Sequence, residues 1–478
     1  MPKERKPASV SETKQAGETS SRWEWVEPTV WTDRMLKALE TGVKGGVWFS
    51  LMDKVYRRRT LEKAFAKVRA NGGSAGVDHV TVKRFEANLD EELEKLQEGL
   101  KSGSYRPQGI RRKYIDKPGS REPRPLGIPT VRDRVVQTAL RMVLEPIFEE
   151  TFDDSSYGFR PGRGCKDALR AVMQKLQSGH YWVVDADIRS YFDRISHRKL
   201  MDKIRERVAD GRVLELIESF LKQEVFETLR HWVPEEGCPQ GAVISPLLAN
   251  IYLNPLDHKM KRQGLEMVRY ADDFVILCRS EAQARQALQA VQQWMASVEL
   301  ELHPEKTRIV DLHEAGFDFL GYHFRAGKPG LPRIVKWPRA KSSKKLRQSL
   351  KPLTKRANGR SLEAIIQLLN PKLRGWFAYY KHSNRRTFGS VDGWVRGRLR
   401  SMLRKRRGLK GRGRGADHHR WPNTYFHERG LFSLTAAFDS AIQSSRRSVP
   451  PTGEPVPGEP DGGFGGRGDG LITVRPYP

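Results

Sequence analysis

Cysteine is scarce in this chain, and its spacing excludes two common kinds of small stabilised domain. Only Cys165, Cys238 and Cys278 occur among 478 residues, and no two of them form a CxxC pair. A structural zinc module of the usual kind needs such pairs, and a disulfide framework needs more cysteines at shorter spacing. The cysteine content is therefore typical of a protein that works in a reducing compartment.

Long apolar runs are also missing. No stretch approaches the roughly 20 consecutive apolar residues that are needed to cross a bilayer. Residues 1–22 are polar and contain no apolar centre of the kind found in secretory signals. The sequence therefore predicts a cytoplasmic protein that does not depend on a membrane.

Acidic residues are few relative to basic ones. The chain has 57 Asp and Glu against 86 Lys and Arg, a formal net charge of +29 and a pI near 10.1. An excess of this size predicts a polyanionic partner, and nucleic acid is the usual one. The positive charge is densest in the C-terminal third, where residues 339–360 hold nine Lys or Arg and no acid.

Hydrophobic patterning predicts a mixture of helices and strands. Apolar residues repeat at intervals of three or four in segments 60–70, 84–101 and 133–149, which indicates amphipathic helices. Segments 181–188 and 267–278 are apolar and β-branched, as buried strands are. The mixture favours an α+β or α/β protein.

Two further segments have a recognisable local pattern. Residues 109–130 predict a strand, a turn around Lys117-Pro118-Gly119-Ser120 and a second strand. Ser361 can cap a helix that runs to Leu369, and Asn370-Pro371 should start a new one.

Carboxylates occur at two places where burying a charge would be costly. Asp272 and Asp273 are adjacent and lie between two apolar segments, which predicts a hairpin with the acids at its turn. Adjacent acids are usually ordinary surface turns, but these apolar flanks favour a functional pair. Upstream, Asp185 and Asp187 share one face of a predicted strand. Nucleotide polymerisation uses two divalent cations about 4 Å apart, and Mg²⁺ prefers oxygen ligands, so two such strands could hold two Mg²⁺ ions.

Nine short blocks follow one another over roughly residues 55–435. They are NGGSAGVD (71–78), RRKYIDKPGSREPRPLGIP (111–129), SYGFRPGRG (156–164), VDADIRSYFDRISH (184–197), CPQGAVISPLLANIYL (238–253), VRYADDFVIL (268–277), LHPEKT (302–307), FDFLGYHF (317–324) and LNPKLRGWFAYYK (369–381). In this order the blocks resemble those of the bacterial group II intron-encoded reverse transcriptase–maturases. The resemblance implies an RNA-directed DNA polymerase that also helps its intron RNA to splice and to move.

The resemblance assigns catalytic roles to five residues. Asp187, Asp272 and Asp273 match the catalytic aspartates that bind two Mg²⁺ ions. Ile188 would offer its main-chain carbonyl to a metal ion. Lys306 matches a lysine that protonates the leaving pyrophosphate, although a surface lysine is the ordinary alternative. Asp185 lies outside this pattern.

The resemblance also assigns a nucleotide-binding site. Lys117 and Arg124 match residues of the fingers that clamp the triphosphate, and their charges suit that role. Phe192 matches a bulky ring that excludes a ribose 2′-hydroxyl and so selects deoxynucleotides. Gln240 and Gly241 match the block that lines the nucleotide pocket.

The implied partners are intron RNA, an RNA template with a DNA primer, target DNA and dNTPs, with no membrane. The implied contacts to nucleic acid share a basic side chain and lie in the C-terminal part of the chain. They are Lys341, Lys344, Lys345, Arg347, Lys372, Arg374, Lys381, Arg385, Arg386, Arg404, Lys405 and Arg406. The cluster Asp417-His418-His419 has no partner cluster, which favours a structural or RNA-contacting role over a metal site.

The predicted fold class is α+β, a right-hand polymerase whose fingers and palm contain an antiparallel sheet, followed by an all-α thumb or maturase domain. The predicted domains are a disordered tail (1–30), a helical extension of the fingers (31–108), fingers and palm (109–330), thumb (331–410), a basic nucleic-acid-binding segment (411–440) and a second disordered tail (441–478).

Two alternatives remain open. The chain could be a splicing-only RNA-binding maturase, but the intact acidic residues disfavour that reading. It could also belong to a retron, a diversity-generating element or a CRISPR-linked system, which the thumb block disfavours. No cysteine follows residue 435, so the chain resembles the branch of the family without an endonuclease, and we expect no cleavage of a second DNA strand by the protein.

Overall fold

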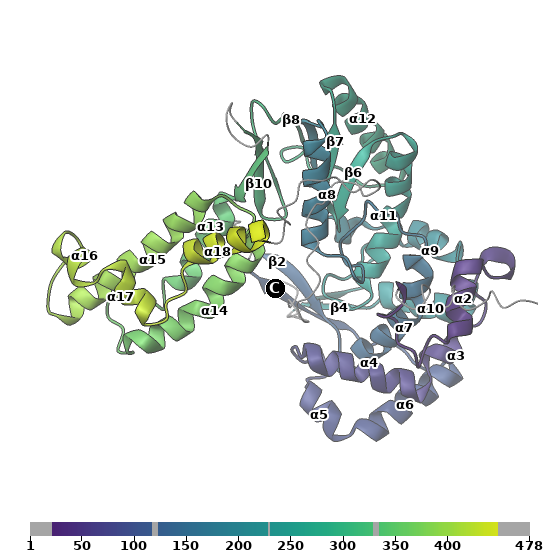
Figure 1. Cartoon of the computed structure of the whole chain (residues 1–478). Coiled ribbons are helices and arrows are strands. Elements are labelled where there is room, and N and C mark those ends of the chain that lie inside the picture. Colours follow the sequence, from purple (N-terminus) through teal and green to yellow (C-terminus); the bar gives the residue numbers. More distant parts are fainter. Residues whose placement is uncertain (1–21, 117–122, 228–229, 328–333, 448–478) are drawn as a thin grey trace, which may run out of the picture. The chain divides into compact units, whose positions relative to one another are not determined.

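The computed structural model describes residues 22–116, 123–227, 230–327 and 334–447. The chain forms two compact units (Figure 1). The first unit comprises Met1–Leu320 and Arg325–Ile334, and the second comprises Gly321–Phe324 and Val335–Pro478. Lys117 and most of the two predicted tails lie outside the described residues. Within the described residues, no helix is both long and apolar enough to cross a membrane.

The first unit begins with helices, most of which contribute buried side chains to its core. They are α2 (Asp33–Thr41), the 3-10 helix η1 (Lys44–Gly46), α3 (Met52–Val55), α4 (Arg58–Asn71), α5 (Val82–Ala87), α6 (Leu89–Ser102) and α7 (Val131–Glu149). Helix α4 packs against both α6 and α7. The helix predicted over 84–101 is two helices, because Asn88 leaves the helical conformation between α5 and α6.

The segment before α2 differs from the predicted tail. Trp23, Val26 and Val30 are buried in the same core as the helices that follow. The indole nitrogen of Trp31 donates a hydrogen bond to the carbonyl of Met142 at 3.1 Å. Residues 22–30 are thus ordered, because their apolar side chains find partners far along the sequence.

The central sheet of the first unit contains four strands in the order β6-β7-β3-β8 (Figure 1). The strands are β3 (Trp182–Asp187), β6 (Glu266–Tyr270), β7 (Asp273–Cys278) and β8 (Arg308–Asp311), and each pairs with its neighbours in antiparallel fashion. The buried strands predicted at 181–188 and 267–278 are therefore confirmed. Helices α8 (Cys165–Gln177), α11 (Ser245–Arg262) and α12 (Glu281–Ser297) pack on this sheet.

A second four-stranded sheet has the order β2-β1-β4-β5. Its strands are β1 (Ile110–Ile115), β2 (Arg124–Ile128), β4 (Val225–Glu227) and β5 (Arg230–Trp232). Strands β1 and β2 pair antiparallel, as the strand–turn–strand pattern predicted, whereas β1 and β4 pair in parallel. Between β3 and β4 in the sequence, the chain forms η2 (Tyr191–Arg194), α9 (His197–Arg205) and α10 (Gly211–Leu221).

The second unit is mainly helical. Short strands β9 (Phe317–Phe319), β10 (Tyr322–Ala326) and β11 (Ile334–Pro338) lie where the chain passes from one unit to the other. The helices are α13 (Ala340–Leu350), α14 (Leu362–Tyr380), α15 (Arg385–Arg406), α16 (Ala416–Arg420), α17 (Asn423–Glu428) and α18 (Leu434–Arg447). Their apolar faces form one core of their own.

One prediction about this unit was wrong in detail. Helix α14 continues through Pro371 instead of restarting there, and Ser361 caps it as expected. The side chain of Asn370 accepts a hydrogen bond from the Phe432 amide and donates one to the Gly430 carbonyl. This tertiary support and the buried face of α14 hold one continuous helix despite the proline.

The C-terminal segment also packs more than its composition suggested. Trp421, Phe426 and Leu431 lie in the core of the second unit, although residues 411–440 were expected to form a basic tail segment. Helix α18 extends to Arg447, inside the tail predicted over 441–478. Apolar residues spaced along a basic segment thus anchor it to the neighbouring helices.

Candidate active site

Three aspartates meet at one end of the central sheet. Strand β3 ends at Asp187, and strand β7 begins at Asp273, which is its direct partner across the antiparallel pair. Directly opposed residues in such a pair have Cα atoms about 4.5–5.5 Å apart, so the two carboxylates start from neighbouring positions. Asp272 precedes Asp273 in the turn between β6 and β7. The expected hairpin with an acidic turn is therefore present.

A buried arginine stabilises the turn between β6 and β7 by hydrogen bonding to its backbone. Arg269 is completely buried, and its Nε donates to Asp257 Oδ1 at 2.7 Å. Its Nη1 donates to the Ala271 carbonyl at 2.9 Å and to Asn250 Oδ1 at 3.0 Å. Asn250 in turn donates to the Gly158 carbonyl at 2.8 Å. One guanidinium thus joins α11, the segment before α8 and the backbone of the acidic turn.

The turn itself needs this support. Ala271 has a φ of 61°, a conformation that non-glycine residues rarely adopt. Gly158 lies so close that a Cβ atom there would be 2.3 Å from the Ala271 amide nitrogen. The sequence analysis did not identify the roles of Arg269 and Asp257. The available signal was a single arginine within an apolar strand, since a buried charge requires a partner.

The aspartates at this end of the sheet differ in the charged groups that lie next to them. Lys306 Nζ donates to Asp187 Oδ2 at 2.6 Å, so this lysine contacts one of the three aspartates. Burial raises the pKa of Asp272 above its ordinary value, and the nearby charge of Asp187 raises this pKa further. Asp185 is paired across the sheet with Arg308, at 3.2 Å.

The donors fit a hard cation, although they are not arranged as a complete ligand set. Among the described residues, no group of three or more His, Cys, Asp or Glu side chains is placed to hold a metal ion. Carboxylate oxygens are nevertheless the ligands that Mg²⁺ prefers. Lys306 supplies positive charge at Asp187 in this conformation. Ile188, the other expected metal ligand, follows β3, and its side chain is buried.

The predicted nucleotide-binding residues converge in part. A cavity of about 190 Å³ is lined by Phe192 and Gln240, among others. The Gln240 side chain accepts a hydrogen bond from Arg124 Nε at 2.9 Å and lies 3.4 Å from Asp193 Oδ2. Burial raises the pKa of Asp193 above its ordinary value. Strand β2, which carries Arg124, is thereby linked to the segment that carries Phe192.

Gly241 is explained by a close backbone approach. Its φ is 107°, and a Cβ atom there would lie 2.5 Å from the Gly127 carbonyl oxygen. The Gly127 amide donates to the Gln240 carbonyl at 2.6 Å. A side chain at position 241 would therefore push β2 away from the cavity. Lys117, the other predicted triphosphate ligand, lies outside the described residues.

Several predicted nucleic-acid contacts of the second unit already have protein partners. Arg404 donates to Asp417 Oδ2 at 2.7 Å, and Arg385 forms two hydrogen bonds of 2.9 Å with Asp439. Arg374 lies 4.7 Å from the ring centre of Phe432. The side chain of Asp417 is buried, which agrees with a structural role for the cluster at 417–419.

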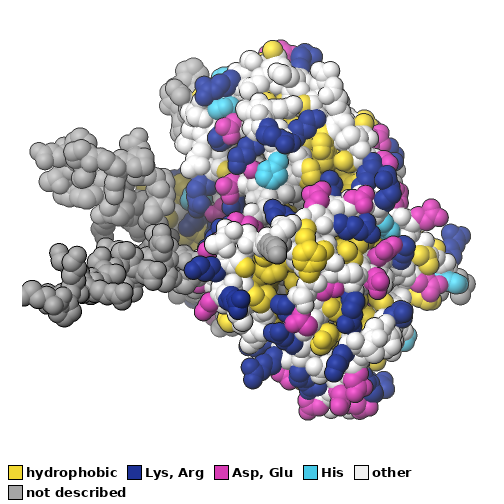
Figure 2. All heavy atoms as spheres, turned by 90° about the vertical axis from the view of Figure 1, so that its right-hand side faces the viewer, with side chains coloured by type: hydrophobic (Ala, Val, Ile, Leu, Met, Phe, Trp, Pro, Cys, Tyr) yellow, Lys and Arg dark blue, Asp and Glu magenta, His cyan; other side chains and the backbone are white. Residues whose placement is uncertain are grey.

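Most of the other basic residues that were predicted to contact nucleic acid have exposed side chains. Lys341, Lys344, Lys345, Lys372, Lys381, Arg386 and Lys405 are exposed. By contrast, the face seen in Figure 2 shows Lys and Arg scattered among Asp and Glu, with apolar patches between them. That face does not have the concentrated positive charge that the C-terminal sequence provides.

Comparison with known proteins gives two family matches. The family described as "Reverse transcriptase (RNA-dependent DNA polymerase)" matches residues 115–324. The family described as "Group II intron, maturase-specific domain" matches residues 343–421. The three aspartates and Lys306 lie in the first match, and Lys344 lies in the second.

Individual proteins are similar to parts of this chain. Protein YkfC of Escherichia coli is 35% identical over 54% of this chain and 78% of its own length. Group II intron-encoded protein LtrA of Lactococcus lactis is 44% identical over 35% of this chain, but the match spans only 28% of LtrA. Among solved structures, a chain of a partial Cas6-RT-Cas1–Cas2 complex aligns at 25% identity, with a TM-score of 0.34, over 52% of this chain and 42% of that chain.

Proposed function

Because this chain belongs to the group II intron reverse transcriptases that carry a maturase domain, we propose that it extends a DNA primer on an RNA template at Asp187, Asp272 and Asp273. As a reverse transcriptase, the chain is an RNA-directed DNA polymerase. The observation that carries the assignment of residues is the direct pairing of Asp187 with Asp273 across β3 and β7, with Asp272 beside them.

The proposed reaction joins the primer 3′-oxygen to the α-phosphorus of a dNTP and releases pyrophosphate. Two bound Mg²⁺ ions would activate the 3′-hydroxyl and stabilise the charge on the triphosphate. The three carboxylates would bind these cations and so position both reactants. The Lys306 ammonium lies at Asp187 and would donate its proton to the leaving pyrophosphate.

The neighbouring residues would select and align the nucleotide. The Phe192 ring lines the cavity beside Gln240 and would occupy the space of a ribose 2′-hydroxyl. Arg124 carries a fixed positive charge suited to the triphosphate, and Gln240 orients its guanidinium. Lys117, which precedes Arg124 by seven positions in the sequence, would add a second positive charge.

The second unit is the proposed maturase, which would bind the intron RNA and assist its splicing. Its match to the maturase-specific domain supports this assignment. Helix α15 carries eight Lys or Arg and a single acid, Asp392. The exposed basic residues among them, such as Arg386 and Lys405, would neutralise phosphates without reading base sequence. Target DNA and a template–primer duplex would meet the same excess of positive charge.

The test is primer extension on an RNA template with Mg²⁺, comparing Asp272→Asn with Asp90→Asn. Asp90 is exposed and lies in α6, so its variant controls for the same chemical change. We expect Asp272→Asn to reduce the extension rate by about four orders of magnitude, as the loss of one catalytic carboxylate can. Binding of intron RNA and protein-assisted splicing should be retained. Normal extension by Asp272→Asn would refute the catalytic assignment.

A further inference from the structure

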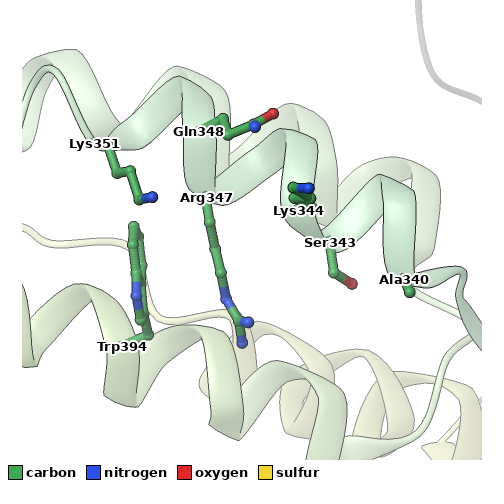
Figure 3. A pocket seen from close by; sticks show the side chains of 7 residues that line it. All are labelled: Ala340, Ser343, Lys344, Arg347, Gln348, Lys351 and Trp394. Carbon is green, nitrogen blue, oxygen red and sulfur yellow. The ribbon is translucent and has the colours of Figure 1, made fainter. Parts of the chain in front are cut away.

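A cavity in the second unit lies apart from the three aspartates in the sequence and has a different chemistry. It has a volume of about 480 Å³ and is lined by Ala340, Ser343, Lys344, Arg347, Gln348, Lys351 and Trp394. Figure 3 shows that Trp394 rises from α15 toward α13, while Arg347 extends from α13 toward α15. An aromatic ring and a guanidinium from two different helices therefore meet in one cavity.

The ring of Trp394 is held in place on one side. The Arg398 guanidinium lies 5.4 Å from the ring centre, and Arg398 does not line the cavity. This guanidinium is itself fixed, because Nε donates to Thr354 Oγ1 at 2.6 Å and Nη2 to the Thr354 carbonyl at 3.0 Å. The indole is thus oriented before any ligand arrives, which lowers the entropy cost of stacking on it.

The charged groups that line the cavity are all hydrogen-bond donors, and no acidic side chain lines it. Arg347 Nη2 donates to Ser390 Oγ at 3.3 Å, but its buried Nε has no acceptor among the described residues. Lys344 and Lys351 are exposed at the same cavity. Arg347, Lys344 and Lys351 therefore bring three positive charges to a cavity that no acidic residue lines. This charge favours an anionic ligand.

The nearest acid in sequence does not compensate for this charge. Helix α13 contains no Asp or Glu, and Asp392 is the only acid of α15. The Asp392 carboxylate is buried and accepts hydrogen bonds from the amides of Leu434 and Thr435 at 3.0 Å. Its charge is engaged at the start of α18.

We propose that this cavity binds a single unpaired ribonucleotide of the intron RNA, with its base stacked on Trp394 and its phosphate held by Arg347, Lys344 and Lys351. Unpaired bases of RNA stack on aromatic side chains, whereas the bases of a duplex are already stacked on one another. The cavity lies within the size range of small-ligand pockets. Ser343 points from α13 toward α15 (Figure 3) and offers a neutral hydroxyl group for the ribose hydroxyl. The site deepens the proposed maturase function and rests on it.

A cross-linking experiment on the unaltered full chain tests the location. The probe is a short RNA duplex with one bulged 5-iodouridine, which forms a photo-cross-link to an adjacent aromatic ring. We expect the cross-linked peptide to contain Trp394. A fully paired RNA with 5-iodouridine at the same position should give no such peptide. A bulged probe that cross-links elsewhere, or not at all, would overturn the site.

An affinity measurement tests the energetics. Trp394→Leu keeps an apolar side chain but removes the stacking surface, and Trp394→Phe retains a smaller ring. Loss of one base–aromatic stack should weaken binding of the bulged RNA by roughly 5- to 150-fold in Trp394→Leu, with a smaller loss in Trp394→Phe. Binding of the paired RNA should change by less than about twofold. Equal losses for both RNAs would overturn the proposal, because they would indicate a general effect.

Charge variants complete the test. Arg347→Gln and Lys351→Gln should weaken the bulged RNA more than Lys355→Gln, a matched control that is exposed near the end of α13 but does not line the cavity. A bulged DNA of the same sequence should bind more weakly, and equal binding would overturn the assignment to RNA. Failure of the maturase function would appear separately, as wild-type protein that does not promote splicing at all.

Discussion

The buried pair of Arg269 and Asp257 gives the sharpest prediction about how the catalytic turn is held. Both side chains are fully buried, so replacing Arg269 by Met leaves a buried carboxylate without its partner. Loss of one partner from such a pair costs about 3–5 kcal/mol. That is a large part of the roughly 5–15 kcal/mol that stabilises an ordinary domain. We therefore expect Arg269→Met to lower the denaturant midpoint of the first unit strongly.

A double variant separates stability from positioning. In Arg269→Met with Asp257→Leu, apolar residues of similar size replace the whole ion pair, and such replacements are often neutral or stabilising. The double variant should therefore regain most of the lost stability. It cannot regain the bond from Arg269 to the Ala271 carbonyl, so the acidic turn loses its support.

The assay is primer extension by the double variant, with denaturant unfolding followed by tryptophan fluorescence in parallel. We expect near-normal stability and a turnover number at least roughly tenfold lower, the loss given by a shift of about 1.4 kcal/mol in barrier height. The KM for dNTP should change less, because the nucleotide cavity does not include this pair. Recovery of activity together with stability would refute the positioning role. A loss below about 1 kcal/mol in the single variant would refute the argument from burial.

Three further outcomes are expected. Replacing Phe192 by Val should let the enzyme incorporate ribonucleotides, since the ring no longer fills the space beside the sugar; unchanged discrimination in single-nucleotide extension would assign the selection to another residue. Lys306→Met should slow the turnover of bound dNTP, and a rate that is unaffected in single-turnover kinetics would exclude it as a proton donor. Neutralising Lys341, Lys344, Lys345 and Arg347 should reduce the salt dependence of RNA affinity by up to about three units of log–log slope, whereas neutralising the exposed Lys67 and Lys83 of the first unit should change it little.

The local elements of the fold were largely predictable because short-range patterns decide them. Apolar, β-branched segments predicted β3, β6 and β7, and the turn residues within 109–130 predicted β1 and β2. Errors arose where a distant contact outweighed the local signal. Pro371 does not interrupt α14, because Asn370 is bound by the segment around Phe432. Likewise Trp421 is drawn into a core that the basic composition around it did not suggest.

The candidate active site was also predictable only in part from local patterns. The order of blocks along the chain was enough to predict a reverse transcriptase with a maturase domain, because spacing and residue type are properties of the sequence itself. Pairing between residues far apart is a different matter. Lys306 and Asp187 are separated by 119 positions, and only the β3–β8 arrangement brings them to 2.6 Å.

The sequence by itself thus determined the family, the strands that carry the aspartates and the excess of positive charge. The tertiary structure decided which charges are free to act. It paired Arg269 with Asp257 beneath the acidic turn and Arg404 with Asp417 inside the second unit. It also placed Trp394 of α15 beside Arg347 of α13. Since a charge is stabilised by its spatial neighbours rather than its sequence neighbours, composition could predict the partner of this protein but not the contacts that bind it.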